Sequence, residues 1–279
     1  MNGEDKHVNK FKIGVQLYSV RDEASKDFAG TLKDLKEMGY EGAELAGTYG
    51  LSAEEIRKAA DDAGLELFSA HVPLSDLRND PEATVDLYHK IGCRWIVVPY
   101  LMPEDRPQSG NFGKTIDDLG KISEVCARYG IRLCYHNHDF EFFRMPDGRY
   151  ALDQLYDSLP AEKLQTELDT CWVHVAGEDP AAYVRKYAGR AQVLHLKDYD
   201  GEKSEDMYAL IGIQRKPNPD AKPFDFRPVG SGKMPIREVI EAAGEAGTEW
   251  LVVEQDEPAK GAGRMESVRA SVEYLKKIL

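Results

Sequence analysis

The sequence predicts a single-domain (β/α)8 barrel, the TIM-barrel fold, over residues 11–279. Three observations predict it: apolar β-rich runs alternate with helix-period segments, the alternation includes eight strand candidates, and 279 residues suit a barrel of roughly 250 residues. Strict alternation implies a parallel sheet, and eight units imply closure. An open doubly wound sheet is the alternative, but no GxGxxG motif follows the first strand candidate.

Local signals set the order of the elements. The helix near residues 52–63, for example, starts on Ser52 with Glu55 three residues later, a capping-box pattern, and ends at Gly64 before the next strand. The predicted strands are 11–20, 40–45, 65–72, 95–100, 131–136, 164–169, 193–197 and 250–254. The predicted helices are 28–38, 52–63, 81–91, 116–129, 152–158, 180–187, 236–246 and 266–277.

Two segments stand outside this rhythm. Residues 1–10 are polar and charged, as expected of a disordered or tag-like N-terminal extension. Residues 199–232 follow the seventh strand, contain four prolines and are too long for an ordinary connector. Long loops on that face of a barrel are usually functional or mobile.

Composition limits the classes of partner. A formal net charge of −13 argues against nucleic acid and favours a small uncharged or carbonyl-bearing substrate. No segment approaches the roughly 20 apolar residues of a membrane span or resembles a signal peptide, so we expect no membrane partner and a cytoplasmic location, unless a leader has been removed from an exported protein. The four cysteines form no CxxC pair and are expected to be reduced and packed.

Four consecutive late strands end in polar residues. Residues two apart in a strand face the same way, and the carboxyl ends of barrel strands surround one funnel where active sites are built. Imidazole and carboxylate groups that converge there can hold a divalent metal. The pairs that share a side are His136 with His138, Glu167 with Asp169, His195 with Lys197, and Glu254 with Asp256.

These groups and their neighbours resemble motifs of the xylose isomerase-like barrels, in particular the sugar phosphate isomerase and epimerase branch. The resemblance runs from Phe11 to the C-terminus and is more specific for the fold and a metal site than for the substrate. Its motifs here are Tyr135-His136-Asn137-His138-Asp139-Phe140-Glu141-Phe142, Glu167-Leu168-Asp169-Thr170, Ala176-Gly177, Leu194-His195-Leu196-Lys197-Asp198, Pro228-Val229-Gly230-Ser231-Gly232 and Val253-Glu254-Gln255-Asp256-Glu257.

The resemblance implies one divalent ion held by His136, Asp169, His195 and Glu254. Such enzymes usually place a glutamate on strand five, which forms a proton shuttle with the strand-eight glutamate; this chain departs from that pattern, because it has His136 at the strand-five position. Related barrels that dehydrate keto compounds look similar in two respects: a histidine two residues after the strand-five ligand, here His138, and a lysine two residues after the strand-seven histidine, here Lys197. Two histidines and two carboxylates suit Mn, Zn or Co better than Mg.

The reaction that these residues allow is proton abstraction next to a carbonyl, with metal stabilisation of the enediolate. We predict His138, Lys197 and Glu254 as the catalytic groups. The family default is an isomerase or epimerase of a sugar or keto-sugar, phosphorylated or not. The alternative is a lyase or dehydratase that removes a β-substituent from a 3-keto-sugar or keto-glycoside, which His136, His138 and Lys197 favour.

Five further residues are predicted to contact the substrate. Gln16 and His71 end strands one and three and face the same funnel. Glu167 precedes the ligand Asp169, and Trp172 offers an apolar wall or a surface for sugar stacking. Arg227 resembles the arginine that related barrels place over the substrate or its phosphate.

Other interpretations remain open. The strand-end groups can form a buried charge network without a metal, and His136 can be purely structural, with Glu141 or Glu167 supplying the extra carboxylate. A catalytically inactive sugar-binding barrel fits the same pattern. The DNA-repair endonuclease that shares this barrel needs a basic groove, which the acidic charge opposes. The oligomeric state, including a homo-oligomer, is also open, because aromatic-rich loops at a barrel mouth often cover a neighbour's site.

Overall fold

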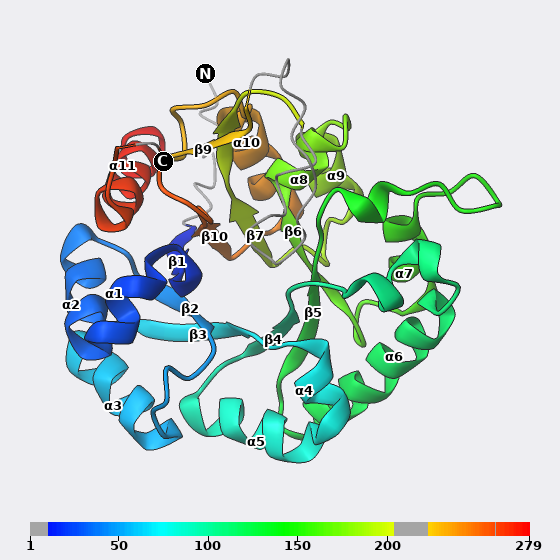
Figure 1. Cartoon of the computed structure of the whole chain (residues 1–279), viewed down its shortest axis with the longest axis horizontal. Helices are drawn as coiled ribbons and strands as arrows, with labels where there is room; N and C mark the ends of the chain where they lie inside the picture. Colours follow the sequence, from blue (N-terminus) through cyan, green and yellow to red (C-terminus); the bar gives the residue numbers. More distant parts are fainter. Residues whose placement is uncertain (1–10, 204–222, 260) are drawn as a thin grey trace, which may run out of the picture.

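A closed barrel of parallel strands occupies the centre of the computed structural model, which describes residues 11–203, 223–259 and 261–279 (Figure 1). Around the barrel the strands follow the order β1, β10, β7, β6, β5, β4, β3, β2. Their bounds are β1 Lys12–Gln16, β2 Gly42–Ala46, β3 Glu66–His71, β4 Trp95–Val98, β5 Arg132–His136, β6 Gln165–Asp169, β7 Val193–Leu196 and β10 Trp250–Val253. The predicted TIM-barrel fold is confirmed.

Helices form an outer ring around these strands (Figure 1). All eight predicted helices are present within a few residues of their expected bounds. The short helices α1, α4 and α8 were not expected, because six residues are too few to establish a helical period. The α-helices are α1 Arg21–Lys26, α2 Phe28–Met38, α3 Ala53–Ala63, α4 Leu74–Asn79, α5 Pro81–Ile91, α6 Phe112–Arg128, α7 Ala151–Ser158, α8 Thr170–Val175, α9 Pro180–Lys186, α10 Ile236–Ala246 and α11 Arg264–Ile278. Short 3-10 helices are η1 Leu17–Val20, η2 Pro103–Asp105, η3 Pro107–Ser109 and η4 Phe140–Phe142.

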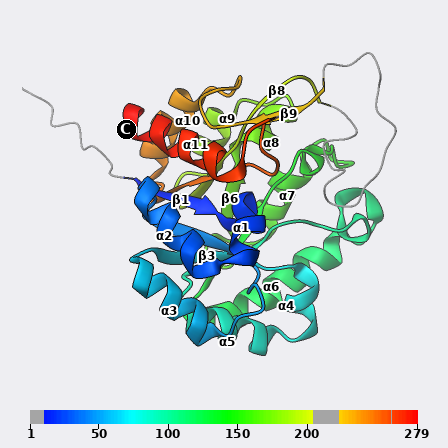
Figure 2. The ribbon, with the colours of Figure 1, turned by 60° about the vertical axis from the view of Figure 1, so that its left-hand side comes forward.

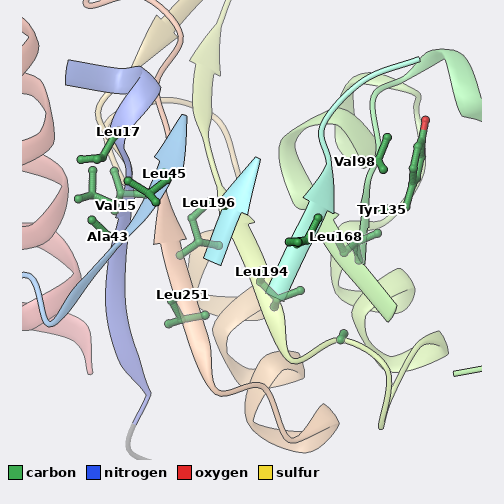
Figure 3. Packing of buried hydrophobic residues seen from close by; sticks show 14 of the residues in the cluster. Val15, Leu17, Ala43, Leu45, Val98, Tyr135, Leu168, Leu194, Leu196 and Leu251 are labelled. Atoms are coloured by element: carbon green, nitrogen blue, oxygen red, sulfur yellow. The ribbon is translucent and has the colours of Figure 1, made fainter. Parts of the chain in front are cut away.

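The alternation of side chains along each strand separates two cores. In β7, Leu194 and Leu196 belong to the cluster between strands and helices, part of which is drawn in Figure 3, whereas Val193 belongs to a second cluster. That second cluster contains a stack of Phe68 on Trp250, with ring centroids 3.9 Å apart. Because these bulky rings come from the first half of their strands, they fill the lower barrel and leave its upper end to the polar residues that follow.

A small hairpin joins the ends of the long connection after β7. β8 (Asp198–Asp200) pairs antiparallel with β9 (Asp225–Arg227) and lies beside α8 (Figure 2). The ring centroids of Trp172 on α8 and Phe226 on β9 are 6.1 Å apart. The Asp198 carboxylate accepts hydrogen bonds from the backbone N–H groups of Gly230 and Gly232 at 3.0 and 2.9 Å. The long connection that was predicted as a loop therefore contains a short strand near each end. The sequence did not predict this pairing, because the two strands are more than 20 residues apart and no short hairpin turn joins them.

Some sequence predictions fall outside the described residues. The N-terminal extension at 1–10 and residues 204–222 of the long connection lie there. Within the described ranges, no helix is both long and apolar enough to cross a membrane. All four cysteines are buried and free, as expected.

Candidate functional site

Neighbouring strands bring the predicted polar groups to one level of the barrel. In the parallel registers, His136 stands opposite Glu167, Asp169 opposite His195, and His195 opposite Val252. Glu254 follows the last residue of β10, two positions beyond Val252, and therefore shares its inward direction. The sequence period of two and the parallel register together cluster side chains that are far apart along the chain.

The four residues predicted as metal ligands form one compact, buried group. Ligand atoms of His136, Asp169, His195 and Glu254 all lie within 4.8 Å of one another. His136 Nε2 is 3.6 Å from Asp169 Oδ2, and His195 Nδ1 is 2.6 Å from Glu254 Oε2. Two donors bound to one ion at about 2.1 Å are at most about 4.2 Å apart, so these spacings are close to those of a coordination shell.

Asp169 is held by its neighbours so that one carboxylate oxygen is left over. Asn137 clasps the Asp169 backbone, since its Oδ1 accepts from the Asp169 N–H at 2.9 Å and its Nδ2 donates to the Asp169 carbonyl at 3.2 Å. Asp169 Oδ1 accepts from the Trp172 N–H at 3.0 Å and so caps α8. Oδ2 is buried and has no hydrogen-bond partner among the described residues. An oxygen of this kind is suited to a cation.

Lys197 lies among three of the carboxylates. Its Nζ is 3.0 Å from Glu254 Oε2, 3.1 Å from Asp256 Oδ1 and 3.4 Å from Asp169 Oδ2. Burial by itself lowers the pKa of Lys197, but the charges of Asp256, Glu254 and Asp169 outweigh it and hold the pKa well above its usual range. The side chain is therefore a buried ammonium. Asp256, although paired with Glu254 in the sequence pattern, was not among the predicted site residues.

A second group lies next to the first and contains a residue that the sequence reasoning missed, Glu44 on β2. Glu44 Oε2 is 2.8 Å from His195 Nε2, 3.2 Å from His71 Nε2, and accepts from Gln16 Nε2 at 2.8 Å. Glu167 Oε2 is 2.6 Å from His71 Nε2 and 3.1 Å from His136 Nδ1. One sequence feature could have indicated that Glu44 belongs to the site: it is the single acidic residue in the apolar strand segment Gly42-Ala43-Glu44-Leu45-Ala46.

His136 and His195 belong to both groups. In each ring one nitrogen faces the carboxylates of the first group, and the other nitrogen faces those of the second. His195 Nδ1 contacts Glu254, while its Nε2 contacts Glu44 and Glu167. His136 Nε2 lies toward Asp169, while its Nδ1 lies toward Glu167. A carboxylate behind a histidine ligand fixes the tautomer and orientation of the ring. This contact is the role that the geometry gives to Glu44 and Glu167.

Replacement of Glu44 by glutamine tests this network. The amide nitrogen would face groups that already donate, so we expect the free energy of unfolding to fall by about 2–4 kcal/mol in urea titrations. Glu41→Gln is the matched control, because Glu41 precedes the same strand, is exposed, and should change the free energy by less than about 0.5 kcal/mol. Equal losses in both variants would contradict a structural role for the buried carboxylate.

The site contains several acidic and several basic side chains. Four buried carboxylates and the partly exposed carboxylate of Asp256 face the Lys197 ammonium and three histidine rings. Burial lowers the pKa of His195, but the charges of Glu167, Glu44 and Glu254 hold it well above its usual range. Burial lowers the pKa of His71, but the charges of Glu44 and Glu167 raise it to about 10. Burial lowers the pKa of His136 well below its usual range, as do the charges of His195 and Lys197. The carboxylates are those of Glu44, Glu167, Asp169, Glu254 and Asp256.

The residues present fit a divalent cation at the first group. The spare Asp169 Oδ2, two imidazoles and the Glu254 carboxylate form a mixed nitrogen and oxygen donor set, which favours Mn, Zn or Co over Mg. A buried cluster that could hold a metal is therefore present, and the identity of its ion remains a prediction.

Above these groups lies a cavity of about 420 Å³, which the site residues enter to different extents. Its lining includes the predicted residues His71, His136, His138, Trp172, Lys197 and Glu254. Gln16 and Glu167 are fully buried and are not lining residues; their side chains support Glu44 and the histidines instead. Arg227 is outside the lining and pairs with Asp225 at 2.7 Å. Substrate contacts by these three residues stay predictions.

His138 is placed by a buried carboxyl group, that of Glu141. Glu141 Oε2 accepts from the His138 backbone N–H at 2.8 Å, and Oε1 accepts from the Tyr135 hydroxyl. The His138 ring stacks on Trp172, with centroids 5.4 Å apart. Burial, together with the charge of Lys197, holds the pKa of His138 well below its usual range, so the ring is a neutral imidazole at the cavity wall.

Glu141 should make stability depend on pH. Burial raises its pKa to about 8, although the hydrogen bonds from Tyr135 and His138 lower it. Between pH 4.5 and 8 the folded chain therefore keeps a proton that the unfolded chain has released, so the free energy of unfolding falls as pH rises, by up to about 1.4 kcal/mol per pH unit. Glu141→Gln should remove this slope in urea titrations at pH 5, 6.5 and 8. Parallel pH dependence in both proteins would contradict it.

Several proteins are similar to this chain along nearly its whole length. It is 22% identical over 275 residues to an inosose dehydratase of Clostridium beijerinckii, covering 89% of each chain. It is 23% identical over 300 residues to an inosose dehydratase of Geobacillus thermodenitrificans, covering 96% of this chain and 97% of the relative. A crystal structure of a sugar phosphate isomerase/epimerase from Parabacteroides distasonis superimposes with a TM-score of 0.78 at 24% identity, covering 96% of this chain and 98% of that one.

A family model decides the classification. The model for the xylose isomerase-like TIM barrel matches residues 32–278, which include every strand of the barrel after β1 and every ligand-type residue of both buried groups. The resemblance seen in the strand-end motifs is thus confirmed. The chain belongs to the xylose isomerase-like TIM barrel family.

Proposed function

We propose that this protein is a divalent-metal-dependent lyase that removes a β-substituent from a keto-sugar or a keto-polyol. The observation that carries the proposal is that strand β5 presents His136, while His138 and Lys197 line the cavity above it. A neutral imidazole and an ammonium form a base and an acid, whereas an epimerase of this family type would rely on two glutamates. The inosose dehydratase names of the relatives support the same reaction class.

The metal would be held by His136, Asp169, His195 and Glu254. When bound, a divalent ion supplies positive charge that stabilises an enediolate and lowers the barrier to its formation. Glu44 and Glu167 hold the two histidine rings from behind, so that their outer nitrogens point toward Asp169 and Glu254. This support means that the ring positions do not depend on the substrate.

The chain's own residues handle the protons. His138 accepts the proton from the carbon next to the substrate carbonyl, and the C–H electron pair becomes the new C=C bond of the enediolate. When the enediolate re-forms the carbonyl, the electron pair of its C=C bond forms a new double bond between the α- and β-carbons. The bond to the β-substituent breaks, and its electron pair leaves with the oxygen. Lys197 then donates a proton to that oxygen, so that a β-hydroxyl departs as water. Trp172 contacts both groups, with Lys197 Nζ 5.4 Å from its ring, and shields them from solvent.

The second candidate is an isomerase or epimerase. Its first half is identical, and the Glu254 carboxylate lines the cavity together with His138, which provides two groups able to exchange a proton with one carbon. In that reaction the enediolate would be reprotonated and no substituent would leave.

Proton NMR in deuterated water distinguishes the two reactions. The Zn²⁺-loaded chain is incubated with an inosose and, separately, with 3-keto-glucose, beside His138→Gln and the surface control His89→Gln. Loss of a ring substituent, abolished by His138→Gln and retained by His89→Gln, is the expected result. Deuterium incorporation with an intact skeleton would support the second candidate, and no change in either substrate would overturn both.

A further inference from the structure

The cavity has two chemically different halves. One half is formed by the ends of β3, β5, β7 and β10 and carries the titratable side chains His71, His136, His138, Lys197, Glu254 and Asp256. The other half is formed by the residues at and after the ends of β1 to β4. Its lining is Tyr18, Ala46, Gly47, Pro73, Asp76, Tyr88, Pro99 and Tyr100.

The second half offers few partners to sugar hydroxyl groups. Proline, alanine and glycine have no polar side-chain atoms. The polar side-chain groups of this half are the hydroxyls of Tyr18, Tyr88 and Tyr100 and the Asp76 carboxylate, and the Tyr100 hydroxyl already accepts a hydrogen bond from Arg106. A hydroxyl group that leaves water without gaining a hydrogen bond costs about 1–3 kcal/mol, so a polyol that filled this half would bind poorly. An apolar group gains free energy by burial there.

Aromatic rings extend this apolar surface as far as the proposed base. Tyr100 meets the His138 ring edge to face, with centroids 5.1 Å apart, and His138 stacks on Trp172. Flat rings packed in this way favour another flat ring in offset-stacked or edge-to-face contact. A planar substituent on the substrate would therefore find suitable partners close to the reacting carbon.

Small residues leave room for such a substituent. Ala46 is the last residue of β2, two positions after Glu44, so its methyl group faces the same inward side. A Cβ added at Gly47 would meet no atom within 4 Å among the described residues. The cavity volume of about 420 Å³ falls in the range of pockets that bury small molecules, roughly 300–1,000 Å³.

We propose that the substrate is a glycoside-type molecule, whose sugar or keto-sugar ring occupies the polar half and whose apolar, aromatic substituent occupies the half lined by Ala46, Pro73, Pro99 and Tyr100. The inference rests on the proposed function in one respect, which is that the polar half receives the keto-sugar ring. It goes further by assigning a second subsite with its own chemistry.

Calorimetric titration of the Zn²⁺-loaded full chain tests the subsite. The probes are a methyl and a 4-nitrophenyl glycoside of the same sugar, each as both anomers. We expect the aryl glycoside of one anomer to bind at least about tenfold more tightly than its methyl counterpart, a difference of about 1.4 kcal/mol. Ala46→Phe should fill the subsite and reduce this preference below about threefold, whereas Ala127→Phe, at an exposed position of α6 outside the cavity lining, should keep it.

Three results of these titrations would contradict the aromatic subsite. Equal binding of aryl and methyl glycosides, no binding of the aryl glycoside, or an unchanged preference in an Ala46→Phe protein that folds and binds Zn²⁺ would overturn the proposal. The NMR assay with free keto-sugars keeps the two proposals apart. Turnover without an aryl preference would remove only the aromatic subsite, and an aryl preference without turnover would remove only the lyase function.

Discussion

Replacing Asp169 by asparagine is expected to weaken binding of Mn²⁺ or Zn²⁺ by at least about 100-fold and to abolish turnover. The substitution removes a negative charge and turns one oxygen into an amide nitrogen, while asparagine remains a good cap for α8. The affected atom is the Oδ2 that is 3.6 Å from His136 Nε2 and lacks a hydrogen-bond partner among the described residues. Folding should therefore be largely preserved, and the loss should appear in metal binding.

Metal content after dialysis and calorimetric titration of the stripped chain measure this effect. Asp179→Asn is the matched control, because Asp179 also caps a helix, accepting from the N–H groups of Ala181 and Ala182 at the start of α9, but lies outside both buried groups. The control should bind metal as the unchanged protein does. If Asp169→Asn bound metal with unchanged affinity, or if the unchanged protein bound none, the cluster would be a structural charge network and the metal site would be rejected.

Replacing Lys197 by methionine should lower both the stability of the protein and its turnover, and the two losses can be measured separately. Without the ammonium, the buried carboxylates of Asp169 and Glu254 and the partly exposed carboxylate of Asp256 lose their cation, so the free energy of unfolding of the metal-free chain should fall by about 3–5 kcal/mol. A bound divalent ion would replace the missing positive charge. We therefore expect excess Zn²⁺ to restore most of the stability, while turnover stays at least about 1,000-fold below that of the unchanged protein.

Urea titrations with and without Zn²⁺, combined with the NMR assay, separate these losses. Lys163→Met is the control, since Lys163 pairs with Glu124 at 2.9 Å on the surface, and such pairs contribute less than about 1 kcal/mol. A loss of stability in Lys197→Met that Zn²⁺ does not change would contradict the placement of a cation beside this ammonium. Full turnover by the metal-loaded variant would remove Lys197 from the proposed mechanism.

Sequence patterns were sufficient for the scaffold because each pattern depends on local physics. The helix α3 is an example: its capping box joins Ser52 and Glu55 through hydrogen bonds in both directions, as the two residues alone suggested. The period of two along a strand likewise predicts that Leu194 and Leu196 face one side of the sheet and His195 the other, without knowledge of the neighbouring strands. The six-residue helix α8 and the three-residue strands β8 and β9 were not predicted, because six residues are too few to show a helical period and three are too few to show the alternation of a strand.

Only part of the candidate site could be predicted from such local patterns. His136, Asp169, His195 and Glu254 were expected to converge because each follows a buried strand, and the structure does bring them together. Glu44 was missed because its position in the apolar run of β2 does not indicate its partners. Its carboxylate contacts His71 and His195, which barrel closure brings to it from β3 and β7. The predicted substrate contact of Glu167 stays a prediction, and the closed barrel adds what the sequence did not indicate, the contacts of its carboxylate with His71 and His136.

The sequence by itself determined the alternation of strand and helix, the inward direction of each strand-end side chain, and the family motifs, because these depend on residues close together along the chain. Only the tertiary structure decided which nitrogen of His136 and His195 faces which carboxylate, how Lys197 is shared among three acids, and that the cavity has an apolar half. Those properties depend on the register between strands and on barrel closure, which bring together residues far apart along the chain. An example is Ser19, whose hydroxyl oxygen accepts a hydrogen bond from the N–H of Gln255, 236 positions away.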